Sequence, residues 1–214
     1  MTIRALVFNM DGTILHSLPD LAICVNGALE RMGYPTRTYD EIESFMGAGC
    51  KELIDQAVPA GTAPEQCAET LELWRSLYLA SDYVNTAPFP GIVDMLHDLR
   101  DRGIKTAILS NKFDAGVRVL ADRCFPGLFD IVQGEIPPLP RKPDPASLLN
   151  MLDELGVGSP EAAYVGDTGV DVLTARNAGV RAIGVSWGYA KAAPLCKEHL
   201  DAFIHDPAEL LALV

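Results

Sequence analysis

Residues 5–13 read Ala5-Leu6-Val7-Phe8-Asn9-Met10-Asp11-Gly12-Thr13, and the prediction of the fold starts from them. Its four leading apolar side chains predict a short strand in the interior of a sheet. The polar residues follow at once, so Asn9 and Asp11 lie just beyond the carboxyl end of that strand. In an open parallel sheet, ligands bind outside the carboxyl ends of the strands. The stretch therefore predicts both a core strand and the position of a binding site.

The chain after residue 88 alternates apolar strand runs with amphipathic helical stretches. This alternation is typical of an α/β fold in which helices cover both faces of a parallel sheet. Gly103, Gly156 and Gly179 follow helical stretches, at places where a helix C-cap favours a positive φ. We therefore predict a doubly wound, Rossmann-like parallel sheet. Its strands are expected at residues 6–8, 105–109, 131–132, 163–165 and 182–185.

Residues 16–86 break this alternation, because helical patterns follow one another with no strand run between them. One apolar stripe ends at Gly33, and a capping box of Thr38 and Glu41 begins the next helix. We therefore predict that a helical domain is inserted into the α/β core. The predicted division is a core of residues 1–15 and 87–214 and a helical domain of residues 16–86.

Polar residues also follow two other predicted strands. Ser110 comes directly after one of them and Asp167 soon after another. An isolated aspartate in such a place is more often a turn former or a helix cap. As a set, however, these two residues meet Asn9 and Asp11 at one edge of the predicted sheet, which favours a functional site.

Four separated segments, in the right order, resemble the motifs of the haloacid dehalogenase superfamily of phosphotransferases. The Asp-x-Asp-Gly-Thr motif of that family corresponds to Asn9 through Thr13, and its strand-terminal Ser or Thr to Ser110. Its lysine corresponds to Lys142, and its acidic motif runs from Asp167 to Asp171. The likeness covers nearly the whole chain and is closest to the phosphoglycolate phosphatase-like branch. Three further stretches resemble that branch: Ser110-Asn111-Lys112, Pro90-Gly91 and Trp187-Gly188-Tyr189.

This resemblance implies a fold and an activity. The helical domain would be a cap over the active site of the α/β core. The activity would be that of a Mg²⁺-dependent phosphomonoester phosphatase, which forms an aspartyl-phosphate intermediate at position 9. The implied partner is a small phosphorylated metabolite. A sugar phosphomutase shares this type of cap and is an open alternative.

The resemblance also implies roles for single residues. Asp11 would be the general acid and base, and Thr13 would orient it. Ser110, Asn111 and Lys142 would hold the phosphoryl group, with the lysine offsetting the charge on its oxygens. Oxygen donors and a phosphate substrate favour magnesium. The implied metal ligands are position 9, the backbone carbonyl of Asp11 and Asp167, with Asp171 either ligating through water or orienting its neighbour.

Asn9 departs from the family pattern at its most important position. An aspartate there could attack phosphorus and bind a divalent cation, whereas a carboxamide lacks the charge and a usable nucleophilic oxygen. We therefore predict that this chain is inactive or nearly so as a phosphatase. Asn9 is either an engineered replacement of aspartate or a natural variant. A natural variant would make the protein a pseudoenzyme that binds a phosphorylated metabolite and acts through its cap.

A glycine-containing loop joins two of the predicted cap helices. The resemblance places it where related phosphatases lower a loop over the substrate. Gly47 and Gly49 would then allow closure, and Cys50 and Lys51 would lie near the leaving group. A plain interhelical turn explains the same glycines equally well.

Composition narrows the possible partners. The 214-residue chain is 49% hydrophobic and 21% charged, as in an ordinary globular protein, and its formal net charge is -12. This charge argues against nucleic acid as a partner. It would also repel a small anionic substrate, so local positive charge from Lys142, Lys112 and a cation would be needed.

Location is predicted from three further features. No apolar run approaches the roughly 20 residues of a membrane helix, and Met1 is followed almost directly by the first strand, which leaves no room for a signal peptide. The five cysteines are an odd number without a Cys-x-x-Cys pair, as expected for reduced thiols. We predict a cytoplasmic protein without a membrane partner, as a monomer or homodimer.

Overall fold

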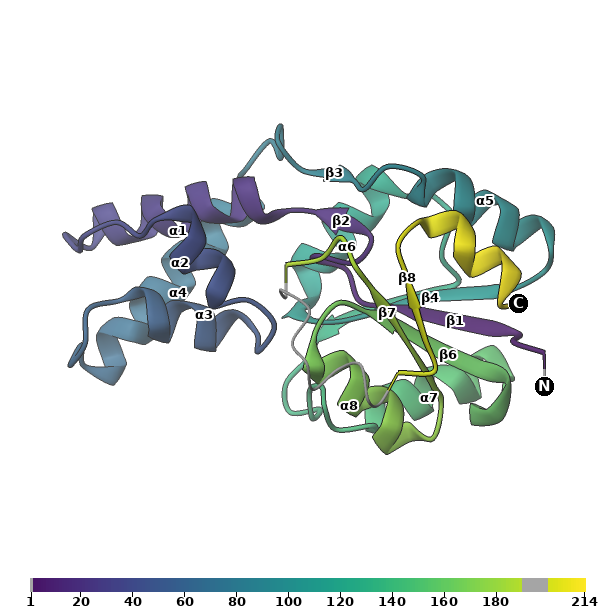
Figure 1. Cartoon of the computed structure of the whole chain (residues 1–214). Helices are drawn as coiled ribbons and strands as arrows, with labels where there is room; N and C mark the ends of the chain where they lie inside the picture. Colours follow the sequence, from purple (N-terminus) through teal and green to yellow (C-terminus); the bar gives the residue numbers. More distant parts are fainter. Residues whose placement is uncertain (1, 190–199) are drawn as a thin grey trace.

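The computed structural model describes residues 2–189 and 200–214 (Figure 1). Its main sheet has six parallel strands in the order β5-β4-β1-β6-β7-β8. The strands are β1 (Ala5–Phe8), β2 (Leu15–His16), β3 (Ala87–Pro88), β4 (Lys105–Phe113), β5 (Ile131–Glu135), β6 (Ala162–Gly166), β7 (Arg181–Val185) and β8 (Ala202–Ile204). The helices are α1 (Leu18–Arg31), α2 (Tyr39–Ser44), α3 (Cys50–Ala57), α4 (Pro64–Leu79), α5 (Ile92–Asp101), α6 (Asp114–Cys124), α7 (Ala146–Leu155) and α8 (Gly169–Ala178), with 3-10 turns η1 (Ser159–Glu161) and η2 (Pro207–Ala212).

The first strand lies at the centre of the sheet, as its apolar sequence predicts. β1 pairs with β4 on one side and with β6 on the other, so that Phe8 lies opposite Ile108 and Val165. Successive side chains of a strand point to opposite faces. Leu6 and Phe8 belong to the core that contains α5 and α6, whereas alternate residues of β1 pack with α7 and α8. Helices therefore cover both faces, which confirms the predicted doubly wound fold.

Three parts of the sheet differ from the sequence prediction. β5 continues to Glu135, whereas it was expected to end at residue 132. β4 does not end at Leu109 but continues to Phe113, with a shift of register against β5 between these two residues. Such an irregularity re-aims side chains in a strand, and it brings the polar residues after Leu109 to the sheet edge. A sixth strand, β8, was not predicted because its three residues carry too short a pattern.

Helices α1 to α4 lie beyond the carboxyl ends of β1, β4 and β6, apart from the helices of the core (Figure 1). Two short antiparallel strands, β2 and β3, carry the chain out of the sheet layer and back into it, where His16 pairs with Ala87. Asp20 at the start of α1 accepts hydrogen bonds from Asn85 and Thr86. These contacts tie the two crossings together beside the site. No helix in the described part of the chain is both long and apolar enough to cross a membrane.

Candidate active site

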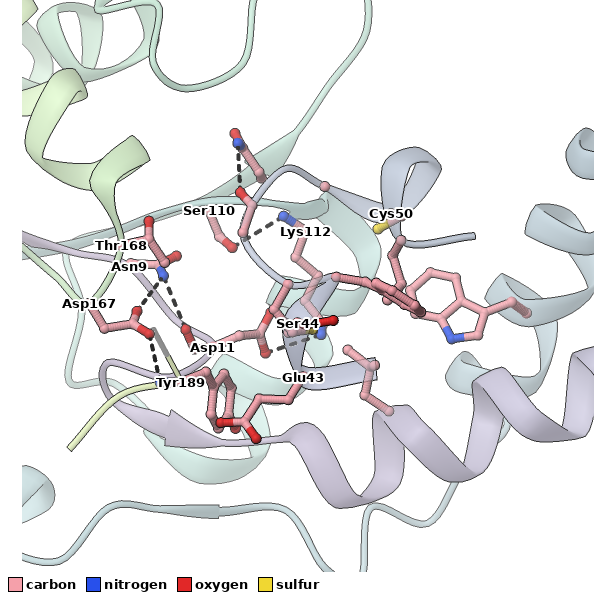
Figure 2. A pocket seen from close by; sticks show the side chains of 18 of the residues that line it. Asn9, Asp11, Glu43, Ser44, Cys50, Ser110, Lys112, Asp167, Thr168 and Tyr189 are labelled. Carbon is pink, nitrogen blue, oxygen red and sulfur yellow. Dashed lines mark hydrogen bonds and ion pairs between the residues drawn. The ribbon is translucent and has the colours of Figure 1, made fainter. Parts of the chain in front are cut away.

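A cavity of about 350 Å³ lies between the carboxyl edge of the sheet and the helices α1 to α4 (Figure 2). Its floor comes from the ends of three adjacent strands: Asn9 and Asp11 after β1, Ser110 in β4, and Asp167 after β6. The central position of β1 explains the convergence, because both of its neighbours end at the same edge. The structure therefore brings together these four residues, which are far apart in the sequence.

Asn9 is held by hydrogen bonds on both sides of its carboxamide. Its Oδ1 accepts from Lys142 Nζ at 3.2 Å, and its Nδ2 donates to Asp167 Oδ1 at 3.3 Å and to the backbone carbonyl of Asp11 at 3.1 Å. Lysine can only donate, so the amide oxygen must face Lys142 and the nitrogen must face the other two groups. Each of these three neighbouring groups thus has a hydrogen bond to the neutral carboxamide of Asn9.

Asp167 lies in a tight and largely enclosed setting. Thr13 Oγ1 donates to its Oδ1 at 2.9 Å, and the backbone N–H of Tyr189 donates to its Oδ2 at 3.0 Å. A Cβ atom at Gly12 or Gly188 would lie 2.4 or 2.2 Å from this side chain, so both glycines are needed for the close approach. Burial raises the pKa of the Asp167 carboxyl above its ordinary value, and the nearby charge of Asp171 adds to the shift.

Thr13 therefore has a different contact from the one that the resemblance implied. Its hydroxyl donates to Asp167, whereas Asp11 Oδ1 accepts a hydrogen bond from Ser17 Oγ. Thr13 follows the tight turn at Gly12, which has a φ of 79°, and this turn directs the hydroxyl toward β6. Ser17, which the sequence analysis did not select, orients Asp11 in its place.

Lys142 lies behind Asn9 with its ammonium group surrounded by acceptors. Besides Asn9, it donates to Tyr164 Oη at 2.8 Å and to Asp171 Oδ1 at 2.7 Å. The other oxygen of Asp171 accepts from the N–H and hydroxyl of Thr168, in a capping box that begins α8. Both carboxylate oxygens are therefore engaged. In the structure Asp171 positions Lys142, and its ligation of a metal through water stays a prediction.

Asp11 forms a buried ion pair with Lys112. Lys112 Nζ lies 3.2 Å from each carboxylate oxygen of Asp11 and 4.3 Å from the centre of the Tyr78 ring on α4. Burial opposes the charged form of Lys112, but the Asp11 carboxylate and Tyr78 outweigh it, so the pKa of Lys112 lies above its ordinary value. Lys112 thus remains an ammonium ion and links the sheet, the floor of the cavity and α4.

Ser110 and Asn111 lie on the opposite side of the floor. The Ser110 hydroxyl lines the cavity and accepts from the backbone N–H of Lys112 at 3.2 Å. Asn111 Oδ1 accepts from the N–H of Lys142, while Asn111 Nδ2 donates to the carbonyls of Lys142 and Gly47. Ser110 is therefore available to a ligand. The Asn111 side chain, in contrast, is used to fix the lysine loop and the glycine loop.

The glycine loop of the helical segment rests directly on the core. Gly47 and Gly49 both line the cavity, and a Cβ at Gly49 would lie 2.9 Å from Arg141 Nη1. Arg141 forms a two-pronged ion pair with Glu52 of α3, one contact being 2.6 Å. Arg141, which the sequence analysis did not select, therefore joins the core loop that carries Lys142 to α3. Its place beside Lys142 in the motif was the available signal.

Cys50 and Lys51 have different positions. Cys50 lines the cavity at the start of α3, and burial raises the pKa of its thiol to about 11, so it is a neutral group. Lys51 is exposed and pairs with Asp55 at 2.5 Å on the surface of α3. The prediction that Lys51 lies near the leaving group is therefore wrong, because the helix turns it away from the cavity. The fifth cysteine, Cys196, lies outside the described residues.

The floor offers only part of a metal site. Asp167 Oδ1 and the Asp11 carbonyl converge on one point, and both are hard oxygen donors of the kind that Mg²⁺ prefers. That point is taken by the Nδ2 group of Asn9, which cannot bind a cation. Among the described residues, no three acidic, histidine or cysteine side chains are grouped so that they could hold a metal ion. The donor set fits a hard divalent cation, with its third oxygen replaced by an amide nitrogen.

Tyr189 is a further site residue that the sequence analysis did not select. Its N–H binds Asp167, and its hydroxyl accepts from the backbone N–H groups of Ser17 and Leu18 at 2.8 and 3.0 Å. Tyr189 therefore links the segment after β7 to the start of α1. The available signal was its place in Trp187-Gly188-Tyr189, a stretch that already carried the resemblance.

Comparisons with known proteins identify the family of this chain. The family model of haloacid dehalogenase-like hydrolases matches residues 6–185. The chain is 32% identical to phosphoglycolate phosphatase 1 of Pseudomonas aeruginosa and 33% identical to a phosphoglycolate phosphatase of Pseudomonas putida, in each case over 97% of this chain and 78% of the relative. A crystal structure from Lactobacillus delbrueckii subsp. bulgaricus is similar with a TM-score of 0.89 at 31% identity, over 98% of this chain and 97% of the other. The chain belongs to the haloacid dehalogenase-like hydrolases and is similar within them to the phosphoglycolate phosphatases.

Proposed function

We propose that the cavity binds the phosphoryl group of a small phosphomonoester and that the chain is a phosphatase of this family with its nucleophile replaced. The observation that supports this most is the convergence of position 9, Ser110 and Asp167 on one floor, with Lys142 directly behind position 9. In this proposal, residues 16–86 act as the cap that encloses the ester.

The roles follow from the contacts. With aspartate at position 9, a carboxylate oxygen would form a bond to phosphorus while the bond from phosphorus to the alcohol oxygen breaks. Asp11 would give its proton to that oxygen and then take a proton from the water that releases phosphate. Ser110 would hold a phosphoryl oxygen, and Lys142 would hold the attacking residue. A magnesium ion held by Asp167, the Asp11 carbonyl and position 9 would offset the phosphoryl charge.

Asn9 leaves binding possible but removes the first bond-forming step. Loss of a catalytic nucleophile lowers turnover by about 10⁴ to 10⁶ fold, so the chain as written binds the ester and hydrolyses it very slowly. The same contacts favour weaker magnesium binding, because the Asn9 amide already satisfies two of the metal's oxygen ligands. With Asn9, the chain therefore acts as a phosphoester-binding protein. An aspartate at this position would make it a phosphatase.

Titration calorimetry with inorganic phosphate tests this proposal without requiring turnover. Ser110→Ala is expected to weaken phosphate binding by about ten-fold or more, in line with the loss of a hydrogen bond to a charged group. Lys142→Met is expected to weaken it as well, because it removes the positive charge behind position 9. Lys51→Met is the matched control, since it removes the same charge from an exposed site away from the cavity. Unchanged phosphate affinity in both site variants would contradict the proposal.

A further inference from the structure

Lys112 is a buried cation beside the cavity to which the proposed reaction gives no role. It lies in the part of β4 beyond Leu109, where the register against β5 shifts, and its side chain is only 3% exposed. A buried ion pair adds little net stability compared with apolar side chains of the same volume. Stability alone therefore does not explain why this position carries a charge.

The Asp11 carboxyl group is held from two sides. Lys112 Nζ donates to both Oδ1 and Oδ2 at 3.2 Å (Figure 2), and Ser17 Oγ donates to Oδ1. An aspartate side chain turns about two single bonds unless contacts hold it. The contacts come from β4 and from the residue before α1, so two different elements fix the orientation of this carboxyl group.

The two oxygens of the Asp11 side chain differ in the contacts that they can still make. Oδ1 accepts hydrogen bonds from both Ser17 and Lys112, whereas Oδ2 accepts from Lys112 alone among the described residues. Oδ2 therefore keeps a position for a proton. Asp11 lines the cavity, where this proton can be given to the alcohol oxygen of an ester.

Lys112 is positioned in turn by α4. Its Nζ lies 4.3 Å from the centre of the Tyr78 ring, a distance at which the face of a ring attracts a cation. Tyr78 is fully buried and stacks on Trp74 with ring centres 5.3 Å apart, so the ring has a fixed place. A chain of contacts thus runs from α4 through Lys112 to Asp11.

We propose that Lys112 is a positioning residue for Asp11 and that it holds the carboxyl group so that Oδ2 faces the departing alcohol oxygen. The inference rests on the proposed function, because it requires Asp11 to protonate that oxygen. As the bond from phosphorus to the alcohol oxygen breaks, its electron pair stays on the oxygen, which takes the proton from Oδ2. Asp11 is left as a carboxylate bound by Lys112 and Ser17.

Two esters of nearly the same shape, phenyl phosphate and p-nitrophenyl phosphate, test this inference in the full chain with Asn9→Asp. p-Nitrophenolate departs readily without a proton, whereas phenolate is a stronger base and departs faster with one. The quantity compared is kcat/KM with magnesium, because it covers the steps only up to departure of the alcohol. Adding Lys112→Met should lower the ratio of kcat/KM for phenyl to that for p-nitrophenyl phosphate by about ten-fold, which is part of the roughly 10² to 10⁴ fold that a positioned proton donor contributes.

The ratio separates positioning from folding, because a loss of folded protein lowers both kcat/KM values equally. Ser17→Ala and Tyr78→Leu should each lower the ratio several-fold, so the test does not depend on the stability of Lys112→Met. Tyr78→Phe, the conservative variant, keeps the ring and should recover the ratio. Lys105→Met is the matched control, since it removes an exposed lysine from the same strand and should leave the ratio unchanged.

The outcomes also separate the two proposals. A ratio that stays within about two-fold in Lys112→Met, Ser17→Ala and Tyr78→Leu overturns the inference, while hydrolysis of the esters by Asn9→Asp keeps the proposed function. Hydrolysis of p-nitrophenyl phosphate but not of phenyl phosphate by Asn9→Asp also overturns the inference, because a positioned donor would serve phenolate as well. A folded Asn9→Asp protein that hydrolyses no phosphomonoester overturns the proposed function and the inference with it.

Discussion

Asn9→Asp should make the stability of this protein depend on a divalent cation. The Asn9 amide now donates to Asp167 Oδ1 at 3.3 Å and to the Asp11 carbonyl at 3.1 Å. An aspartate of nearly the same shape would place a negative oxygen against both of these acceptors. The contact to Lys142 would remain and become an ion pair. The fold should persist, but the floor of the cavity would carry unbalanced negative charge.

The expected cost follows from these distances. The two lost hydrogen bonds are together worth about 2 to 4 kcal/mol, since one of them goes to a charged group. Repulsion between two unit charges at 3.3 Å adds up to about 5 kcal/mol at an effective dielectric constant of roughly 20. The stronger contact to Lys142 and partial protonation offset much of this sum. We expect a net loss of about 3 kcal/mol, or about 6 to 12 °C in Tm for a domain of this size.

Thermal unfolding with a chelator and with magnesium measures this effect. A cation at about 100 times its Kd adds roughly 2.7 kcal/mol, so magnesium should return most of the lost stability to Asn9→Asp. The parent chain should respond less. Asn111→Asp is a useful control, because it makes the same chemical change at a residue that contacts backbone groups only. An Asn9→Asp protein with the parent's Tm in chelator and no response to magnesium would refute the reasoning.

Three further predictions concern other parts of the site. Calorimetry should detect weak magnesium binding to the parent chain and less to Asp167→Ala; equal affinities would remove Asp167 from the proposed metal ligands. Hydrogen exchange at Gly47 and Gly49 should slow when phosphate and magnesium are added, since a closing loop shields the site, and unchanged exchange would favour a plain turn. Lys112→Met should lower the free energy of unfolding by about 3 to 5 kcal/mol, as expected for one broken partner of a buried pair, whereas the surface change Lys105→Met should cost less than about 1 kcal/mol. Similar costs for the two lysines, measured by urea unfolding, would contradict a buried ion pair.

The central strands and the floor of the site could be predicted because each depends on a local pattern. Buried runs such as residues 5–8 contain no polar residue, so they are recognised as strands. Asp167 directly follows its strand. Parallel topology then brings these strand ends to one edge. No long-range contact had to be known to place them there.

Other features depend on contacts that a linear pattern does not contain. Lys112 and Asp11 are 101 positions apart, and nothing local marks them as partners. β8 has only three residues and is defined by its pairing with β7. Lys51 is next to the cavity in sequence but is turned away by the helix that begins at Cys50.

Asp171 shows how a motif can locate a residue without giving its contacts. The motif placed it near Asp167, as observed. Its oxygens are nevertheless taken by Lys142 and by the helix cap at Thr168, which a motif alone does not reveal.

The most direct test of the account is phosphatase activity after Asn9→Asp. With magnesium, this variant should hydrolyse p-nitrophenyl phosphate or a preferred phosphomonoester at least about 10⁴-fold faster than the parent chain. A chelator should abolish the activity, and adding Lys142→Met should remove most of the gain. A folded Asn9→Asp protein that binds magnesium but shows no hydrolysis and no phosphomutase activity across a broad panel of phosphomonoesters would contradict the assignment of position 9 as the site of attack.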